Sequence, residues 1–312
     1  MAQYSNQAGT MSKLDQFITW YSKINQNKFR DSYSPHKPIT ILFALSKVLK
    51  GERWIDYLTE RNQLESTIGS VSKTYPDCLQ PLWRLLNDSK VHSFWVVTPN
   101  DLSPNKSGDI PVGQAKEKKL QAGFSDEIYY WLKGDKTTTQ LLIDYILEDN
   151  FPETLTDELL QKLGVDEIVL EAAEPETTKA FITRIKRDPL FPKKVMQAYD
   201  FRCCFCHLKL FLNHAPLPLE AAHIKWKARG GECLENNGLS LCPTHHYTFD
   251  KGIWSVDQNM NIVLNSKAAF DSKTDRFFTE FKGKSITATI IDKKFLPREE
   301  NLEWHRKNIF RD

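Results

Sequence analysis

Apolar residues recur at helical spacing through most of the first half of this 312-residue chain. The spacing predicts helices over residues 14–24, 38–51, 124–134, 138–150 and 156–164. The stretch 81–97 predicts a helix that passes into a strand, because its end, FWVV, is rich in aromatic and β-branched residues. Residues 101–114, with their proline, glycine and polar side chains, predict a loop. The first half is therefore expected to be mainly helical.

Shorter elements follow in the second half of the chain. The segment LEAAHI predicts a strand that carries His223 at its end, and a turn at Gly230 and Gly231 comes next. A helix is predicted from Pro243, because proline favours the first turn of a helix. A mainly helical part followed by a part with a short strand and a helix makes the expected fold class α+β.

The charge of the chain changes sign near its middle. Residues 144–178 contain eleven acidic side chains and one basic one, whereas residues 179–229 contain eleven basic and three acidic ones. Such a reversal indicates a boundary between parts with different partners, and a basic block suits a polyanion. Two solvated surfaces of opposite sign would give the same pattern. We expect a first domain over 1–165, an acidic linker over 166–180 and a second domain over 181–312.

The composition narrows the class of protein. Hydrophobic residues make up 40% of the chain and charged residues 26%, as in folded soluble proteins. The longest apolar stretch, at residues 39–45, is far shorter than the roughly 20 residues needed to cross a bilayer. The N-terminus is polar and lacks the apolar core of a signal sequence. We therefore expect a cytoplasmic protein without a membrane partner.

Two pairs of residues have the spacing of zinc ligands. Cys203 and Cys206 form a Cys-x2-Cys pair, and Cys242 and His245 form a Cys-x2-His pair. Three thiolates and one imidazole make the closed tetrahedral set that structural Zn²⁺ prefers, and cytoplasmic cysteines favour metal binding over disulfides. Because residues 207–241 separate the pairs, zinc is expected to hold together the base of an inserted subdomain. Buried core cysteines are the alternative interpretation.

Three residues beside these pairs resemble the His-Asn-His signature of the ββα-metal nucleases, known as HNH: His223, Asn237 and His246. Hydrolysis of a phosphodiester needs a base that activates water and a cation that stabilises the developing charge. His223 is the expected base, because a neutral imidazole accepts a proton near pH 7. Asn237 is expected to fix the loop that orients His223, because an amide donates and accepts hydrogen bonds at once.

His246 is expected to bind the catalytic Mg²⁺ or Mn²⁺, or to contact the scissile phosphate. Many HNH sites have an aspartate or histidine directly before the base as a metal ligand, but Ala222 stands there in this chain. We therefore expect the ion to depend on His246 and on either Asp250, which is four residues later on the same helix face, or Asn237. The sequence does not identify the residue that replaces the usual ligand.

Most of the chain resembles the phosphorothioation-dependent restriction endonucleases, in which a sulfur-binding domain is fused to an HNH nuclease. The similar stretches of the first half are PHKP at 35–38, PLWRL at 81–85, GFS at 123–125 and FP at 151–152. Those of the second half are RDPLFPKKVMQAYDFRC, LEAAHIKW, NNGLSLCPTHHYTFDKG and LEWHRKNIF. These stretches follow the order of the family, which makes the resemblance more specific than any one of them.

The resemblance implies binding of DNA in which sulfur replaces a non-bridging phosphate oxygen. Pro81 would line an apolar hollow, because sulfur is larger than oxygen and a poorer hydrogen-bond acceptor. The implied donors to the DNA backbone are His36, Lys37 and Arg84, with Lys118 and Lys119 as further candidates. The family has a tyrosine before the proline, whereas this chain has Gln80, so another backbone or another modification also fits.

The expected function is cleavage of double-stranded DNA that carries a backbone phosphorothioate, in restriction or defence, with structural Zn²⁺ and catalytic Mg²⁺ or Mn²⁺. One alternative is an HNH restriction enzyme that reads a modified base. Another is a zinc-stabilised DNA-binding protein whose nuclease has decayed, although the joint presence of His223, Asn237 and His246 argues against decay. The recognised sequence, the cleavage distance and the choice between a monomer and a homodimer stay open.

Overall fold

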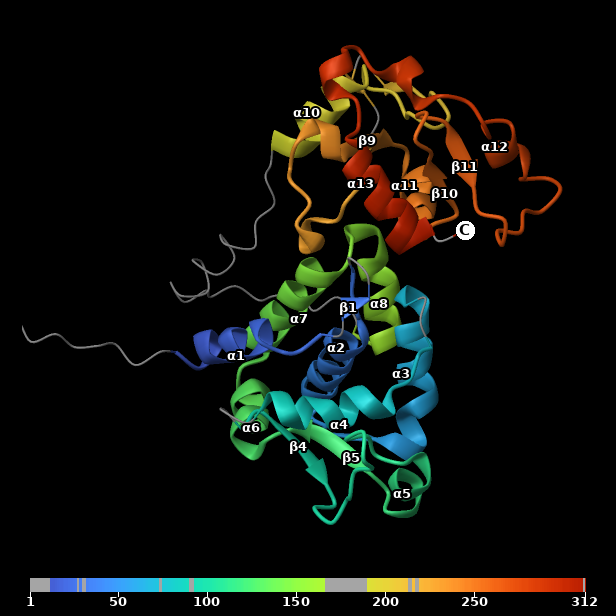
Figure 1. Ribbon diagram of the computed structural model, residues 1–312. Helices are drawn as coiled ribbons and strands as arrows, with labels where there is room; N and C mark the ends of the chain where they lie inside the picture. The colour runs from blue at the N-terminus through green and yellow to red at the C-terminus, as the bar shows by residue number, and fades with distance from the viewer. Residues whose placement is uncertain are drawn as a thin grey trace, which may run out of the picture. The chain divides into compact units, whose positions relative to one another are not determined.

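The computed structural model describes residues 12–26, 28–29, 32–72, 75–89, 93–165, 190–212, 215–216, 219–310 and 312. Contacts divide the chain into two compact units. The first contains residues 33–143 with 12–26 and 162–165, and the second contains 190–312 with 144–161 and the short stretch at 28–32. The expected fold class, α+β with a mainly helical first part, is confirmed (Figure 1). The expected linker, 166–180, lies outside the described residues, so its bounds stay a prediction.

Helices surround one buried helix in the first unit. They are α1 (Lys13–Ser22), α2 (His36–Leu49), α3 (Tyr57–Val71), α4 (Leu79–Asp88), α5 (Val112–Glu117) and α6 (Asp126–Gly134). Every residue of α2 from Pro38 to Val48 is buried, because most of these residues are apolar and α3, α4 and α6 pack against the helix. Helix α7 (Lys136–Asn150), the 3₁₀ turn η1 (Glu153–Leu155) and α8 (Thr156–Leu163) follow in the chain, and their residues 144–161 belong to the second unit.

A small antiparallel sheet completes the first unit, with strands in the order β3 (Trp54–Asp56), β5 (Gln121–Phe124) and β4 (Trp95–Thr98). Figure 1 shows β4 and β5 side by side, close to α4. The buried side chains of these strands include Ile55, Trp95 and Phe124, which face the helices as part of the core. The strands β1 (Lys28–Phe29) and β2 (Ser32–Tyr33) have two residues each and pair with each other, and their residues up to Ser32 belong to the second unit.

Two sequence predictions for this unit need correction. Helix α3 was not predicted, because only Tyr57, Leu64, Thr67 and Ile68 are buried along its 15 residues and its apolar stripe is too thin to see. The loop predicted over 101–114 ends earlier, because α5 begins at Val112 after the extended Pro111. The helices expected at 14–24, 38–51, 124–134, 138–150 and 156–164 are confirmed with small shifts of their ends.

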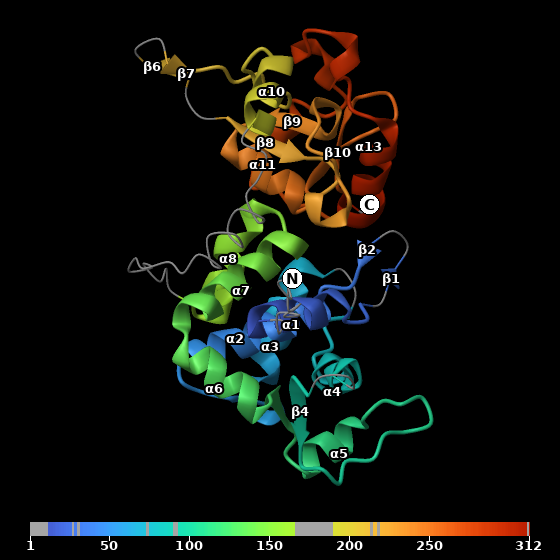
Figure 2. The same cartoon turned by 90° about the vertical axis from the view of Figure 1, so that its left-hand side faces the viewer.

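The second unit is built around a ββα arrangement. Its strands β8 (Glu220–His223) and β9 (Gly238–Leu241) form an antiparallel pair, and α11 (Pro243–Asp250) follows β9 directly. Figure 2 shows α10 (Leu190–Ala198) beside this pair. A Cβ atom at Gly238 would lie 2.4 Å from Val195 Cγ2, so only glycine allows α10 to pack this closely on β9.

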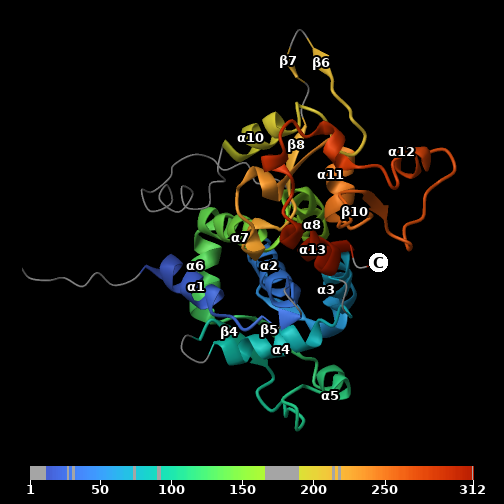
Figure 3. The same ribbon diagram turned by 45° about the horizontal axis from the view of Figure 1, so that its top comes forward.

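Further short elements surround the ββα arrangement. They are β6 (Phe211–Leu212), β7 (Ala215–Pro216), η2 (Lys227–Arg229), η3 (Glu235–Asn237), β10 (Trp254–Val256), β11 (Ile262–Leu264), α12 (Arg276–Thr279), η4 (Ile286–Thr289), η5 (Lys293–Phe295), α13 (Glu299–His305) and the π-helical turn η6 (Arg306–Phe310). The β6–β7 ribbon projects from the unit in Figures 2 and 3. The core contains Phe205, Leu239, Phe249 and Trp254, all fully buried. None of the helices in the described part of the chain combines the length and the apolar character that a bilayer crossing requires.

An ion pair with little solvent exposure joins α2 to α4 in the first unit. Lys37 Nζ lies 2.5 Å from Asp88 Oδ2 and donates to the backbone oxygen of Asn25 at 2.7 Å. The two charged side chains are only 12% and 10% exposed. Lys37, which the family resemblance assigned to DNA, therefore has a partner inside its own domain.

We predict that Lys37→Ala destabilises the protein, because it leaves the carboxylate of Asp88 without its ammonium partner. Loss of one member of a buried pair costs about 3 kcal/mol. Chemical denaturation followed by tryptophan fluorescence measures this loss. Lys118→Ala is the matched control: its partner Asp101 is 70% exposed, and a surface pair contributes at most about 1 kcal/mol. Equal stability of the two variants would contradict a structural role for Lys37.

Candidate active site and metal cluster

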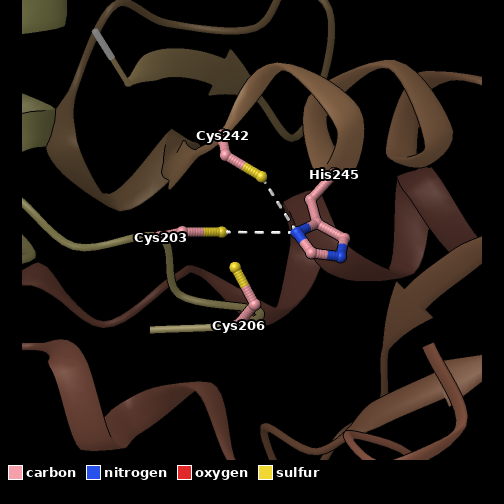
Figure 4. A group of neighbouring side chains, drawn as sticks. All are labelled: Cys203, Cys206, Cys242 and His245. Atoms are coloured by element: carbon pink, nitrogen blue, oxygen red, sulfur yellow. Dashed lines mark hydrogen bonds between the residues drawn. The ribbon is translucent and has the colours of Figure 1, made fainter. Parts of the chain in front are cut away.

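Three thiols and one imidazole converge within the second unit (Figure 4). The ligand atoms of Cys203, Cys206, Cys242 and His245 all lie within 4.8 Å of one another. His245 Nδ1 is 3.1 Å from Cys242 Sγ and 3.7 Å from Cys203 Sγ. Tetrahedral zinc with bonds of about 2.0–2.3 Å separates its ligand atoms by roughly 3.5 Å. The sequence prediction that these four residues meet is therefore confirmed, and their spacing fits one Zn²⁺.

Local backbone geometry prepares this cluster. The turn after Cys203 is closed by hydrogen bonds from His207 N to Cys203 O at 2.8 Å and from Cys203 N to Leu208 O at 3.0 Å. Cys242 precedes Pro243 at the start of α11, so His245 lies on the first turn of that helix. Phe205 stacks on the His245 ring with 4.0 Å between centroids, which fixes the imidazole.

A thiolate and an imidazole in contact dominate the electrostatics of the cluster. Hydrogen bonds from the thiols of Cys203 and Cys206 lower the pKa of Cys242 far below its ordinary value. A thiolate so stabilised is the form that binds metal. Burial lowers the pKa of His245, but contacts with Cys203 and Cys242 outweigh burial and raise it to about 9. The thiolate of Cys242 is thus stabilised before any metal arrives, and the imidazole of His245 would release its proton on binding one.

The predicted catalytic residues lie on the ββα arrangement. His223 ends β8, Asn237 directly precedes β9, and His246 is on α11 one residue after the cluster ligand His245. Phe191 of α10 stacks on the His223 ring at 4.0 Å with an angle of 15° between the planes. His223 and His246 both line one hollow, so the geometry brings these two histidines to a common surface.

Asn237 holds the loop after β8 through three hydrogen bonds. Its Oδ1 accepts from Lys225 N at 2.9 Å, and its Nδ2 donates to Lys225 O at 3.0 Å and to Glu232 O at 2.9 Å. The side chain is buried, and each bond fixes backbone close to His223. Residue 231 must be glycine here, because a Cβ atom would lie 1.8 Å from Lys225 O. This arrangement has the geometry expected of a residue that positions the base rather than reacting.

His246 lies between two carboxylates. Its Nδ1 is 2.8 Å from Glu220 Oε2, and its Nε2 is 3.2 Å from Asp250 Oδ2. Burial lowers the pKa of His246, but the charges of Asp250 and Glu220 outweigh burial and raise it to about 9. Trp226 Nε1 donates to Asp250 Oδ1 at 3.2 Å. The expected closeness of His246 and Asp250 on one helix face is confirmed.

Two residues of this site were missed at the level of sequence. Glu220 lines the same hollow, and Cys233 is half-buried with its Sγ 3.5 Å from His223 Nε2. The signal for Glu220 was an acidic residue three positions before the base, at the start of the predicted strand. No spacing rule pointed to Cys233, because only the loop held by Asn237 brings it to His223.

The residues expected to contact DNA come from α2, from α4 and from the end of α5. His36 has Ser34 Oγ at 2.7 Å from Nδ1 and Tyr75 O at 2.9 Å from Nε2. Pro81 is buried on α4, whereas Lys119 is exposed beyond the end of α5. Their roles in DNA binding stay predictions.

Two further cations among the expected DNA contacts form ion pairs with acidic side chains. Arg84 pairs with Asp109, and Lys118 lies 2.7 Å from Asp101 Oδ2. The loop that carries Asp109 also covers α4, because Trp83 Nε1 donates to Gly108 O at 3.0 Å. Release of these cations toward a phosphate would therefore require breaking surface ion pairs, which are weak.

We predict one zinc atom per chain, held by the cluster. Cys203→Ser or Cys242→Ser should remove the metal and unfold the second unit, because structural zinc contributes on the order of 10–16 kcal/mol to finger peptides. Elemental analysis and thermal denaturation measure the two effects. Cys78→Ser is the matched control, since that thiol is buried in the first unit and should leave the zinc content unchanged. Zinc-free protein that is folded and active would contradict the prediction.

Comparison with known proteins agrees with both parts of this description. Residues 14–168 match the family described as the ScoMcrA-like DNA sulfur-binding domain, and residues 203–257 match the HNH endonuclease family. None of the curated proteins matches the chain.

Solved structures give weaker similarity. The chain is similar to the sulfur-binding domain of ScoMcrA in complex with phosphorothioated DNA at 15% identity, covering 48% of this chain and 95% of that chain with a TM-score of 0.42. The sulfur-binding domain of SprMcrA in complex with phosphorothioated DNA is similar at 15% identity, covering 49% of this chain and 95% of that chain with a TM-score of 0.40. The modification-dependent restriction endonuclease TagI is similar at 20% identity, covering 39% of this chain and 38% of that chain with a TM-score of 0.31. From the two family matches, the chain belongs to the proteins that combine a ScoMcrA-like DNA sulfur-binding domain with an HNH endonuclease domain.

Proposed function

We propose that this protein is a restriction endonuclease that cleaves double-stranded DNA bearing a phosphorothioate, at a site formed by His223, Asn237 and His246. The observation that carries the proposal is the joint presence, in one chain, of a DNA sulfur-binding domain and an HNH site. His223 and His246 line one hollow there, and Asn237 fixes the loop beside it. A binding domain alone would not need two histidines at one hollow, so cleavage is the better reading than binding alone.

His223 acts as the general base in this proposal. Its ring is held against Phe191, and the loop beside it is fixed by Asn237, so the imidazole has few orientations available. A fixed imidazole that takes a proton from water raises the rate only if water and phosphate lie in line, and a rigid site favours this alignment. A divalent ion, when bound, supplies Lewis acidity to the phosphate and the leaving oxygen.

His223→Ala is expected to reduce the rate of cleavage by about 10²–10⁴-fold while DNA binding and folding stay unchanged, because the residue acts on water. A plasmid-nicking time course and a binding titration measure the two properties. His207→Asn is the matched control, since His207 is an exposed histidine with φ +61°, a conformation that asparagine tolerates. Cleavage by His223→Ala within a few-fold of the native rate would show that another group is the base.

Recognition of sulfur is assigned to the first domain. Both a normal and a phosphorothioated duplex carry nearly the same charge, so counterion release contributes similarly to the affinity of each. Preference for sulfur must then come from contact with apolar groups, for which Pro81 on α4 is the candidate. The neighbouring Gln80 donates to Ile110 O at 3.4 Å, and its Oε1 is buried with no hydrogen-bond partner among the described residues.

We predict that the full-length His223→Ala protein binds a phosphorothioated duplex more tightly than the same unmodified duplex at every salt concentration. Pro81→Ser should remove mainly this difference, whereas Lys119→Ala should weaken both duplexes, because an exposed cation contacts phosphate without regard to sulfur. Gln80→Tyr should enlarge the difference. Fluorescence anisotropy across a salt series measures the affinity of all four proteins for the two duplexes. Equal affinity for the two duplexes would refute the assignment to sulfur and leave the nuclease proposal intact.

A further inference from the structure

We infer that Glu220 and the Nδ1 atom of His246 are the protein ligands of the catalytic divalent ion, and that Asp250 positions His246 through its other ring nitrogen. This inference rests on the proposed nuclease function and specifies its metal site. It assigns a ligand from three residues before the base, and it gives Asp250 a supporting role in place of direct coordination.

The position directly before the base is unavailable for metal binding in this chain. Ala222 is fully buried and belongs to the hydrophobic core of the second unit. Adjacent residues of a strand face opposite sides, so residues 220 and 222 share a side in the middle of a regular strand. Glu220, however, is the first residue of β8, where the strand emerges from the core, and its side chain is 42% exposed. A carboxylate at 220 therefore reaches solvent, whereas one at 222 would be buried.

Pairing of the strands brings Glu220 to α11. Glu220 is opposite Leu241 in the β8–β9 register, and Leu241 is followed by Cys242 and α11. His246 lies one helical turn into α11, and its Nδ1 is 2.8 Å from Glu220 Oε2. Adjacent ligands of an octahedral ion with bonds of about 2.1 Å lie about 3 Å apart. The two atoms thus have nearly the spacing of neighbouring ligands of one divalent ion.

Asp250 is committed to other partners. Its side chain is only 1% exposed. Its Oδ1 accepts from Trp226 Nε1, while its Oδ2 accepts from His246 Nε2 and also from the hydroxyl of Thr154. With Nε2 held as the donor to Asp250, Nδ1 is the nitrogen that faces Glu220, and a cation bound between these two atoms would replace the proton that they share. Asp250 therefore fixes the ring and its tautomer.

The donor set indicates the class of ion. One carboxylate and one imidazole suit Mg²⁺, Mn²⁺, Co²⁺ or Ni²⁺, which fill their other positions with water and phosphate oxygens. The thiol of Cys233, which would favour a softer ion, lies instead at His223, 3.5 Å from its Nε2. The pair Glu220–His246 therefore offers oxygen and nitrogen ligands, whereas the cluster that fits zinc offers mainly thiols.

Manganese binding in the absence of DNA tests this inference. The zinc-loaded full-length protein is titrated with Mn²⁺, and the free ion is measured from its electron paramagnetic resonance signal. Glu220→Gln, which keeps size and hydrogen bonding, is expected to weaken binding by more than tenfold, and Glu220→Asp to retain part of the affinity. Asp250→Asn is expected to weaken binding by about tenfold, as is typical when a residue that orients a ligand is changed. Glu303→Gln, an exposed carboxylate paired with Lys307, is the matched control and should change nothing.

A cleavage assay distinguishes the two roles. Raised Mn²⁺ concentration should restore cleavage by Asp250→Asn, whereas His223→Ala should stay inactive at any concentration. Zinc content and melting temperature, unchanged in Glu220→Gln, exclude unfolding as the cause of lost binding. Unchanged Mn²⁺ affinity in Glu220→Gln would overturn the assignment of Glu220, and loss in Asp250→Asn as large as in Glu220→Gln would overturn the supporting role of Asp250. Native protein that binds Mn²⁺ through Glu220 yet cuts no DNA would instead contradict the proposed function.

Discussion

Convergence of Cys203, Cys206, Cys242 and His245 on one point is the constraint on which the nuclease site depends. The second unit has short strands and short helices, which by themselves hold a site loosely. The cluster joins the turn at Cys203 to the start of α11, and Cys204 N donates to Ser240 O at 2.8 Å, which ties the same turn to β9. The next residue after the cluster ligand His245 is His246. A shift of the cluster would therefore move a catalytic side chain directly.

Buried polar groups with defined partners complete the site. Asn237 satisfies three backbone atoms, and Asp250 holds His246 while it is held by Trp226. Each of these side chains would be costly to bury without its partners. Because these side chains have all their hydrogen-bond partners in one arrangement, that arrangement is stable. Alignment of water with the phosphate requires such a single arrangement of the site. On α11 the structural and catalytic requirements thus fall on different side chains: His245 belongs to the metal cluster, and Asp250 holds the ring of the neighbouring His246.

The sequence predicted the residues that carry the chemistry better than it predicted the residues that contact and support them. Cys203, Cys206, Cys242 and His245 were predictable because ligand spacing is local, and His246 with Asp250 because four residues make one helical turn. Glu220 was not recognised as a partner of His246, because the strand register that joins them links residues 26 positions apart. Cys233 likewise reaches His223 only through the folded loop.

In the first unit, spacing predicted the strongly apolar helix α2 and overlooked α3, whose apolar residues are few. The family resemblance assigned Lys37 to the DNA backbone, but no local pattern revealed that Asp88, 51 positions away, is its partner. Positive side chains on a sequence are therefore poor guides to a DNA-binding face until their ion pairs are known. The candidates that stay exposed, such as Lys119, deserve the first substitutions.

Cleavage of matched plasmids tests the central claim most directly. One plasmid carries phosphorothioate linkages and the other has the same sequence without them, and both are incubated with the zinc-loaded protein and Mn²⁺. We expect double-strand cleavage of the modified plasmid only, dependent on Mn²⁺ and lost on its chelation. Equal cleavage of both plasmids would contradict recognition of the backbone modification, and no cleavage of either would contradict the assignment of a nuclease.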